Sequence, residues 1–141
     1  MKKLLLIFIC IFIFSLNSCT TSTEKVLKND PIFVFSSSKS AGEVIACITN
    51  EWSKTSAGNT QKYGRPLETH PSTDGTILVW RMEAGYVGLK LKATNNLVHV
   101  KENPDGGSLS IIKSRGYFLS KNRKGWDPLI ESTENCNETI E

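Results

Sequence analysis

Between residues 76 and 113 the chain alternates short β-rich segments with tight turns, and this pattern constrains the fold more than any other feature. Val87, Leu89 and Leu91 alternate with lysines, as in a strand with one apolar face. Connections this short join antiparallel neighbours, because parallel strands need a crossover of about a dozen residues. The segments that read as strands are 76–82, 86–92, 97–101 and 108–113, with turns at 95–96 and 104–107. The sequence therefore predicts an antiparallel meander of about four strands.

A helix is expected on either side of this meander. Ser40 and Glu43 have the spacing of a capping box, and apolar residues then recur at helical spacing, which predicts a helix over 41–54. Asp127 and Pro128 suit the N-cap and the first position of a second helix, over 128–136. The expected fold class is α+β, with an N-terminal helix, the meander and a short C-terminal helix, and with both helices on one face of the sheet.

The other face of this sheet is expected to be solvated or to bind a partner. The polar residues assigned to it are Lys90, Lys92, His99 and Lys101.

The N-terminus has the pattern of an export signal. Two lysines at positions 2 and 3 precede the apolar segment 4–14, which is shorter than the roughly 20 residues that a membrane-spanning helix needs. The alternative is a retained N-terminal helix.

Leu16-Asn17-Ser18-Cys19 follows this segment and resembles the lipobox of bacterial lipoproteins. The resemblance covers about the first 20 residues, departs from the usual pattern at Asn17, and implies nothing about the folded domain. It implies cleavage before Cys19 and acylation of that cysteine. In Gram-negative lipoproteins Asp at the next position commonly signals inner-membrane retention, so Thr20 implies the outer membrane if the source is Gram-negative.

These assignments divide the chain into three parts. Residues 1–18 are expected to be the signal peptide, 19–35 the lipidated cysteine and a flexible tether, and 36–141 a single α+β domain. At the end of the tether, the apolar run 32–35 is open to two readings, a short strand or a hydrophobic segment that lies on the domain. The signal removes two of the 17 basic residues, which leaves 15 against 14 acidic ones and no strong field for nucleic acid.

Two cysteines remain for the domain, Cys47 and Cys136, because Cys10 leaves with the signal and Cys19 carries the lipid. An exported chain lies in an oxidising compartment, so this pair is expected to form a disulfide. Such a bridge contributes roughly 4 to 5 kcal/mol in the chain-entropy model. The alternatives are a reactive thiol or a metal ligand, but neither cysteine has a histidine or second cysteine at ligand spacing.

The capped helix, the meander and the terminal cysteine together loosely resemble small uncharacterised lipoproteins of bacteria and their prophages. The residues that carry this resemblance are Cys47, Ile48, Trp52 and Cys136.

The residue patterns that mark enzymes are scarce. His70 precedes Pro71 in an expected loop, and His99 lies on the polar side of a strand, so a surface or packing role is favoured over a metal site for both. The sequence has no Gly-x-Ser-x-Gly elbow, no supported pair of catalytic carboxylates and no phosphate-binding glycine loop. A Ser-His-Asp triad is a spatial arrangement and stays open. We therefore expect a protein without catalytic residues, metal or cofactor.

One stretch is a candidate binding surface, because basic and aromatic residues alternate along 113–126. Such a surface suits an anionic or carbohydrate partner or a protein with an acidic groove. The alternative is a solvated loop whose aromatic residues help to close the core. The candidate residues are Arg115, Tyr117, Phe118, Lys121, Arg123, Lys124 and Trp126.

The sequence thus predicts a non-enzymatic, lipid-anchored binding module of the cell envelope, most simply on the outer membrane facing the periplasm. Its expected partners are the membrane, through the N-terminal lipid, and an envelope protein or an anionic or cell-wall ligand. One version is an exclusion-type lipoprotein that masks a receptor. Another is an inhibitor of a cell-wall hydrolase, because Ala84-Gly85-Tyr86-Val87 is similar to a motif of small β-rich lysozyme inhibitors, although the flanking helices differ from that family. A small envelope enzyme is the third hypothesis.

Overall fold

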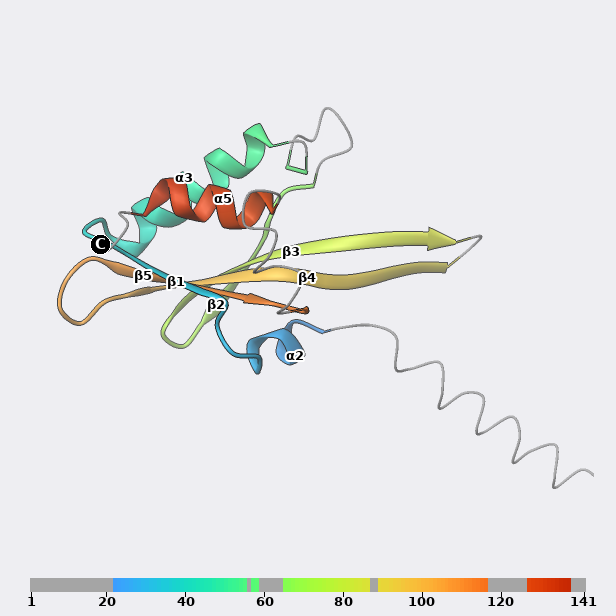
Figure 1. Cartoon of the computed structure of the whole chain (residues 1–141), viewed down its shortest axis with the longest axis horizontal. Coiled ribbons are helices and arrows are strands. Elements are labelled where there is room, and N and C mark those ends of the chain that lie inside the picture. The colour runs from blue at the N-terminus through green and yellow to red at the C-terminus, as the bar shows by residue number, and fades with distance from the viewer. Residues whose placement is uncertain (1–21, 56, 59–64, 87–88, 117–126, 138–141) are drawn as a thin grey trace, which may run out of the picture.

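A computed structural model describes residues 22–55, 57–58, 65–86, 89–116 and 127–137, with the backbone alone over 82–86 and 89–92. The described elements follow one another in the order α2 (Thr23–Leu27), β1 (Phe33–Ser37), α3 (Ala41–Lys54), β2 (Glu68–Ser72), β3 (Gly75–Tyr86), β4 (Leu89–Glu102), β5 (Ser108–Ser114) and α5 (Pro128–Cys136). They form an α+β fold around one antiparallel sheet (Figure 1).

The sheet has five strands in the order β1-β5-β4-β3-β2, rather than the predicted meander of about four. Strands β3, β4 and β5 are the antiparallel core of that meander. β1 adds to the outer edge of β5, and β2 adds to β3. β2 contains Pro71, which the sequence placed in a loop; an edge strand tolerates proline because one side of it forms no ladder.

The predicted turn at Asn95-Asn96 is wrong, because β4 runs straight through it. The register shifts between Trp80 and Arg81, which pair with Asn96 and Thr94, and this leaves Asn95 unpaired as a bulge. A bulge absorbs one extra residue without ending the strand. Two expected strands, 86–92 and 97–101, are therefore one strand.

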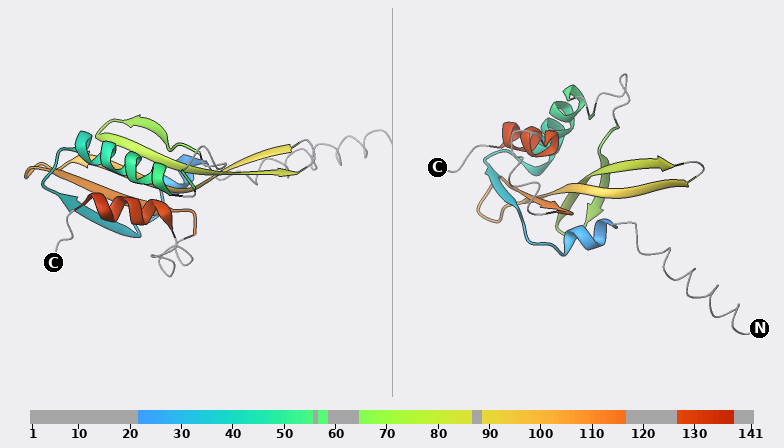
Figure 2. Two further views of the ribbon diagram at one scale, coloured as in Figure 1. Left: turned by 90° about the horizontal axis from the view of Figure 1, so that it is seen from above. Right: turned by 45° about the vertical axis from the view of Figure 1, so that its right-hand side comes forward.

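Helices α3 and α5 lie side by side on one face of the sheet (Figure 2). α3 has the expected bounds, although α2 precedes it in the chain, and its capping box is formed: Ser40 Oγ accepts from the Glu43 N–H, and the Glu43 side chain accepts from the Ser40 N–H. Pro128 begins α5 and Asp127 caps it, as predicted. The buried residues between helices and sheet include Val44, Ile48, Trp52, Leu78, Val98, Ile112, Leu129 and Ile130.

The predicted disulfide joins these two helices. Cys47 and Cys136 are bonded, with Cα atoms 5.7 Å apart and a sequence separation of 89. The bridge fixes α5, which has nine residues, against the longer α3. Because isolated helices of this length are marginal in water, the bridge and the packing together hold α5 in place.

The expected flexible tether over 19–35 differs from the structure, which packs part of it on the sheet. Ser22 caps α2, and Val26 is fully buried against the face opposite α3 and α5. Its neighbours there are Ile77, Val79 and Leu97. Residues 33–35, at the end of the assigned tether, begin β1, in agreement with the alternative that 32–35 form a short strand. A five-residue helix has too few apolar positions to show a helical period, so its burial depends on tertiary contacts that the local sequence does not contain.

The N-cap of α5 is a buried carboxylate. Asp127 is 8% exposed and accepts hydrogen bonds from the Leu129 and Ile130 N–H groups, at 3.0 and 3.3 Å, and from the Asn96 side chain. Burial raises the pKa of Asp127, and these hydrogen bonds oppose that effect only in part. Within the described residues the Asn96 Oδ1 atom has no hydrogen-bond partner, so the side chain of Asn96 is hydrogen-bonded there only to Asp127, through its Nδ2 donor.

Replacing Asp127 with asparagine, also a favoured N-cap residue, is expected to flatten part of the pH dependence of stability. A carboxyl group whose pKa is raised on folding binds its proton more readily in the folded state. The contribution of Asp127 to the free energy of unfolding is therefore greatest below the unfolded pKa, and it falls as the pH rises to the folded pKa.

The measurement is urea unfolding of both proteins at several values from about pH 3 to pH 7. The free energy of unfolding of the wild type minus that of Asp127→Asn should decrease over this range. A difference that is constant or increases would contradict the assignment.

Candidate interaction surface

Strands β3 and β4 continue well beyond the body of the sheet and form a two-stranded projection (Figures 1 and 2). β2 pairs with β3 only up to Val79, and β5 pairs with β4 only from Asn96 onward. Beyond those points β3 and β4 pair with each other as far as Tyr86 and Leu89. We call residues 82–86 and 89–93 the β3–β4 arm. In Figure 1, α3 and α5 cover the body of the sheet and not the arm.

The register of the arm separates apolar from charged positions. Met82 pairs with Ala93, Ala84 with Leu91 and Tyr86 with Leu89, whereas Glu83 pairs with Lys92 and Gly85 with Lys90. Successive residues of a strand alternate between the two faces of a ribbon. One face of the arm therefore holds six apolar or aromatic positions, and the other holds two lysines and one glutamate.

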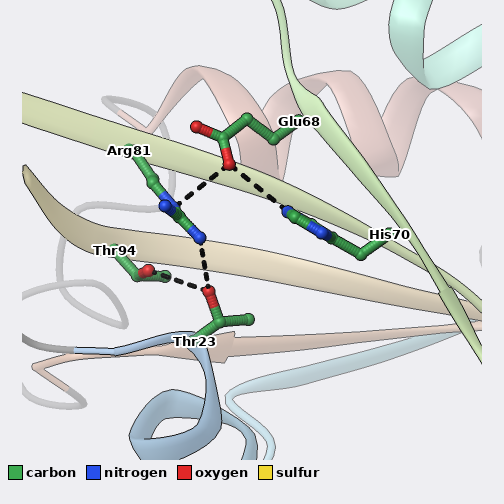
Figure 3. Close-up of polar contacts among 5 residues, drawn as sticks. All are labelled: Thr23, Glu68, His70, Arg81 and Thr94. Atoms are coloured by element: carbon green, nitrogen blue, oxygen red, sulfur yellow. Dashed lines mark hydrogen bonds and ion pairs between the residues drawn. The ribbon is translucent and has the colours of Figure 1, made fainter.

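A polar cluster lies where the arm leaves the body (Figure 3). Arg81 Nε lies 3.2 Å from Glu68 Oε2, and His70 Nε2 lies 3.3 Å from the same oxygen. Arg81 Nη2 donates to Thr23 Oγ1 at 3.2 Å, and Thr23 Oγ1 lies 3.2 Å from Thr94 Oγ1. The cluster thus joins β2, β3, β4 and the first residue of α2.

The cluster positions α2 more than it stabilises the fold. The side chains of Arg81 and Glu68 are 30% and 40% exposed. Solvent screening limits such a pair to about 1 kcal/mol or less. Its effect is that the chain enters the folded domain beside the root of the arm.

The other end of this first segment is held as well. Lys113 Nζ donates to the Leu27 carbonyl at 2.5 Å, and Asn29 Nδ2 donates to the Ser114 carbonyl at 2.7 Å. With Val26 buried between them, residues 23–29 are fixed to the sheet at both ends and in the middle.

The polar residues assigned to the second face of the sheet do not form one basic surface. His99 Nε2 lies 3.0 Å from Asp74 Oδ1, and Lys101 Nζ lies 3.8 Å from Asp74 Oδ2. Desolvation raises the pKa of Asp74, but His99, a hydrogen bond from Ser72, its own backbone and Lys101 together lower it below its usual value. His99 and Lys101 are thus matched by Asp74 at the β2–β3 turn, while Lys90 and Lys92 lie in the arm.

Most of the predicted basic and aromatic surface lies outside the described residues, as do Cys19 and the rest of the signal region. The candidates there are Tyr117, Phe118, Lys121, Arg123, Lys124 and Trp126. Arg115 is described: it is exposed after the end of β5, and its N–H donates to the Asn95 carbonyl at 2.9 Å. Arg115 therefore lies at the bulge, beside the root of the arm.

Sequence reasoning did not find the contacts of Arg81, Glu68 and Thr23. Glu68 and Arg81 are 13 positions apart along the chain, and Thr23 and Glu68 are 45 positions apart. Only the strand register and the docking of α2 bring the three residues together. The arm did leave a signal, since apolar residues and lysines alternate along 86–92. That signal was assigned to an ordinary strand of the sheet.

Searches against protein-family models, curated proteins and solved structures found no match for this chain. Among the described residues no helix is long and apolar enough to cross a membrane. The same residues contain no group of three or more histidine, cysteine, aspartate or glutamate side chains placed to hold a metal ion.

Proposed function

We propose that this chain is a lipid-anchored protein of the bacterial cell envelope and that its domain is a non-enzymatic binding module. Cys19 carries the lipid, after cleavage of residues 1–18, and the domain faces the periplasm from the outer membrane. The β3–β4 arm is its binding surface.

The observation that carries this proposal is the place where the chain enters the fold. Ser22 caps the docked helix α2 and lies only three positions after Cys19. Three residues span at most about 11 Å. An acyl group on Cys19 would therefore hold the domain close to the bilayer, with the root of the arm on the near side. Multiple acyl chains make such an attachment stable.

The arm suits binding because it lies outside the core that the domain builds for itself. Isolated two-stranded ribbons are at best marginally stable in water. A ribbon that keeps apolar residues on one face gains stability from a partner that covers that face.

The anchor is tested by expressing the full chain in a Gram-negative bacterium with labelled palmitate. The wild type should incorporate the label, lose residues 1–18 and sediment with outer-membrane vesicles on a density gradient. Cys19→Ala should incorporate no label and should leave the membrane fraction or keep its uncleaved signal.

Cys10→Ala is the matched control, because the proposal removes that cysteine with the signal. It should behave as the wild type does. Mass spectrometry that finds Met1 intact and no fatty acid on the wild-type protein would overturn the proposed location.

A second function, inhibition of a cell-wall hydrolase, is favoured by the place of Ala84, Gly85 and Tyr86 at the far end of β3. From that position a side chain could enter an enzyme cleft. The test is lysozyme turnover with equimolar protein: an inhibitor should abolish it, and Tyr86→Ala should restore it. Unchanged turnover with the wild type would exclude this function for the enzyme tested.

A further inference from the structure

We propose that the domain rests on the bilayer through the face of its sheet that carries α2, here called the α2 face, with α3 and α5 on the side away from the membrane. The partner of the α2 face is a lipid surface with anionic headgroups. This inference rests on the proposed anchor at Cys19 and deepens it, because an acyl group holds the domain near a membrane without determining which side of the domain meets it.

The first argument is the side of the sheet from which the chain leaves toward Cys19. Thr23 lies on the face opposite α3 and α5, where Arg81 Nη2 donates to its hydroxyl and Thr94 Oγ1 lies 3.2 Å away (Figures 1 and 3). Cys19 is four positions before Thr23, and four residues span at most about 14 Å. A lipid on Cys19 is therefore held within that distance of the α2 face.

This connection is too short for the opposite orientation. The layer of α3 and α5 is by itself about 10 to 12 Å thick, because that is the diameter of a helix with its side chains. The sheet lies between this layer and Thr23, and packed layers are about 10 Å apart, so Cys19 cannot reach the outer side of α3 and α5. Because Val26 is buried and Lys113 Nζ donates to the Leu27 carbonyl, α2 supplies no further length without leaving the sheet.

The second argument is an apolar patch on the α2 face. Val34 pairs with Ile111, Ile111 with His99, and His99 with Ile77. Residues that pair across an antiparallel ladder have their side chains on the same face of the sheet. Ile77 packs in the cluster that Val26 of α2 completes, so Val34 and Ile111 lie on the α2 face as well.

This patch is open to solvent beyond the part of the face that α2 covers. Val34 is 57% exposed, the one large apolar side chain among the described residues that is mostly exposed. Ile111 and Leu109, two residues apart in β5 and so on one face, are half-buried. Leu109 pairs with Lys101, which borders the patch. Surfaces that rest in a membrane interface combine apolar side chains with lysine or arginine at their margins.

The third argument is the distribution of charge between the two sides of the sheet. Helices α3 and α5 carry four glutamates and one lysine, namely Glu43, Glu51, Glu131, Glu134 and Lys54. An anionic membrane repels that layer.

The α2 face has the opposite balance, with seven basic positions against five acidic ones on α2, the chain after it and the strands. The basic residues are Lys25, Lys28, Arg81, Lys90, Lys92, Lys101 and Lys113, and the acidic residues are Glu24, Asp30, Glu68, Asp74 and Glu83. Glu68 lies against Arg81, and Asp74 lies against His99 and Lys101. Each basic residue near an anionic membrane strengthens binding roughly fivefold, so this side is attracted where the helix layer is repelled.

This orientation also assigns a side to the apolar positions of the β3–β4 arm. By register they share the face of Trp80, which packs against the core under α3 and α5. They therefore lie on the side away from the bilayer, where an envelope protein has access to them.

The experiment uses the lipidated full-length chain, reconstituted in vesicles of phosphatidylcholine with phosphatidylglycerol. A single cysteine, Val34→Cys, carries an environment-sensitive fluorophore on the α2 face. Asn50→Cys, exposed on α3, is the control on the opposite side of the domain. Mass spectrometry verifies the acyl group on Cys19 and the Cys47–Cys136 bond in every sample, and circular dichroism verifies the fold.

Brominated acyl chains should quench the Val34→Cys label roughly twofold and the Asn50→Cys label not at all. The double substitution Lys25→Gln/Lys28→Gln removes two exposed lysines of the α2 face. It should weaken the association of this face with anionic vesicles roughly thirtyfold, seen as loss of the quenching, with no loss of the anchor. Lys39→Gln/Lys54→Gln, at the two ends of α3, should leave the quenching unchanged.

The outcomes separate the two proposals. If Cys19 is acylated and the protein floats with the vesicles, but brominated lipid quenches neither label, the anchor stands and this inference is wrong. Quenching of the Asn50→Cys label in place of the Val34→Cys label reverses the orientation and overturns the inference as well. A Val34→Cys label that is protected from aqueous iodide but unaffected by brominated lipid is covered by a second copy, which also overturns it. If no acyl group is found, the proposed anchor fails first, and this inference fails with it.

Discussion

Removal of the disulfide by the double substitution Cys47→Ala/Cys136→Ala is expected to lower the free energy of unfolding by about 4 kcal/mol. The bridge closes a loop of 89 residues, and loops of this length gain most from a cross-link in the chain-entropy model. A domain of this size has a total stability of about 5 to 15 kcal/mol, so the loss is a large fraction of it.

Urea unfolding followed by circular dichroism measures this effect, and reduced wild-type protein is the control. Reduction should destabilise the wild type by a similar amount and should not affect the double variant. Hydrogen exchange should increase most in α5, whose nine residues lose their covalent link to α3. Equal midpoints for oxidised wild type and double variant would contradict the expected contribution.

Trp52→Ala is expected to cost about 3 to 5 kcal/mol, the second large effect. The Trp52 side chain is 1% exposed at the centre of the core between α3 and the sheet. Its ring packs edge-on against Trp80 with centroids 5.4 Å apart, and its Nε1–H donates to the Arg65 carbonyl at 2.8 Å. A Cβ added to Gly58 would lie 2.6 Å from Nε1, so the segment after α3 packs tightly on the indole.

The matched variant is Trp52→Phe, which keeps an aromatic ring but removes the donor. It should cost about 1 to 3 kcal/mol, because the Arg65 carbonyl loses its buried partner. If both variants unfold at the midpoint of the wild type, Trp52 does not have the structural role assigned to it.

The parts of the fold that could be predicted have local signals. The capping box of Ser40 and Glu43 marks the start of α3, and Asp127 with Pro128 marks the start of α5. The disulfide was predicted from the number of cysteines and the export signal, and the structure confirms it.

The parts that could not be predicted depend on contacts between distant segments. Val26 and Leu27 are two apolar residues in a polar stretch, and only Ile77, Val79 and Leu97 make Val26 part of a core. Pro71 argues against a strand unless one knows that β2 is at the edge of the sheet. Asn95-Asn96 reads as a turn, because a bulge and a turn favour the same residues and differ only in the partner strand.

The candidate surface was likewise predictable only where its signal is local to the sequence. The alternation along 86–92 predicted a strand with one apolar face, but the sequence does not say where the neighbouring strands end. That β2 and β5 stop at Val79 and Asn96, and so leave the arm unsupported, is a property of the whole sheet. The basic and aromatic stretch of 113–126 stays a prediction, with Arg115 alone placed beside the arm.

The proline in β2 also determines how copies of this sheet can join through the edges of its body. Head-to-tail growth into a fibril requires β1 of one molecule to add to β2 of the next, and Pro71 cannot donate a backbone hydrogen bond to that neighbour. Addition through β1 to another β1 is self-complementary and leaves β2 outermost on both sides. Joining of this kind therefore ends at a pair, so the body of the sheet is protected from polymerising through its edges.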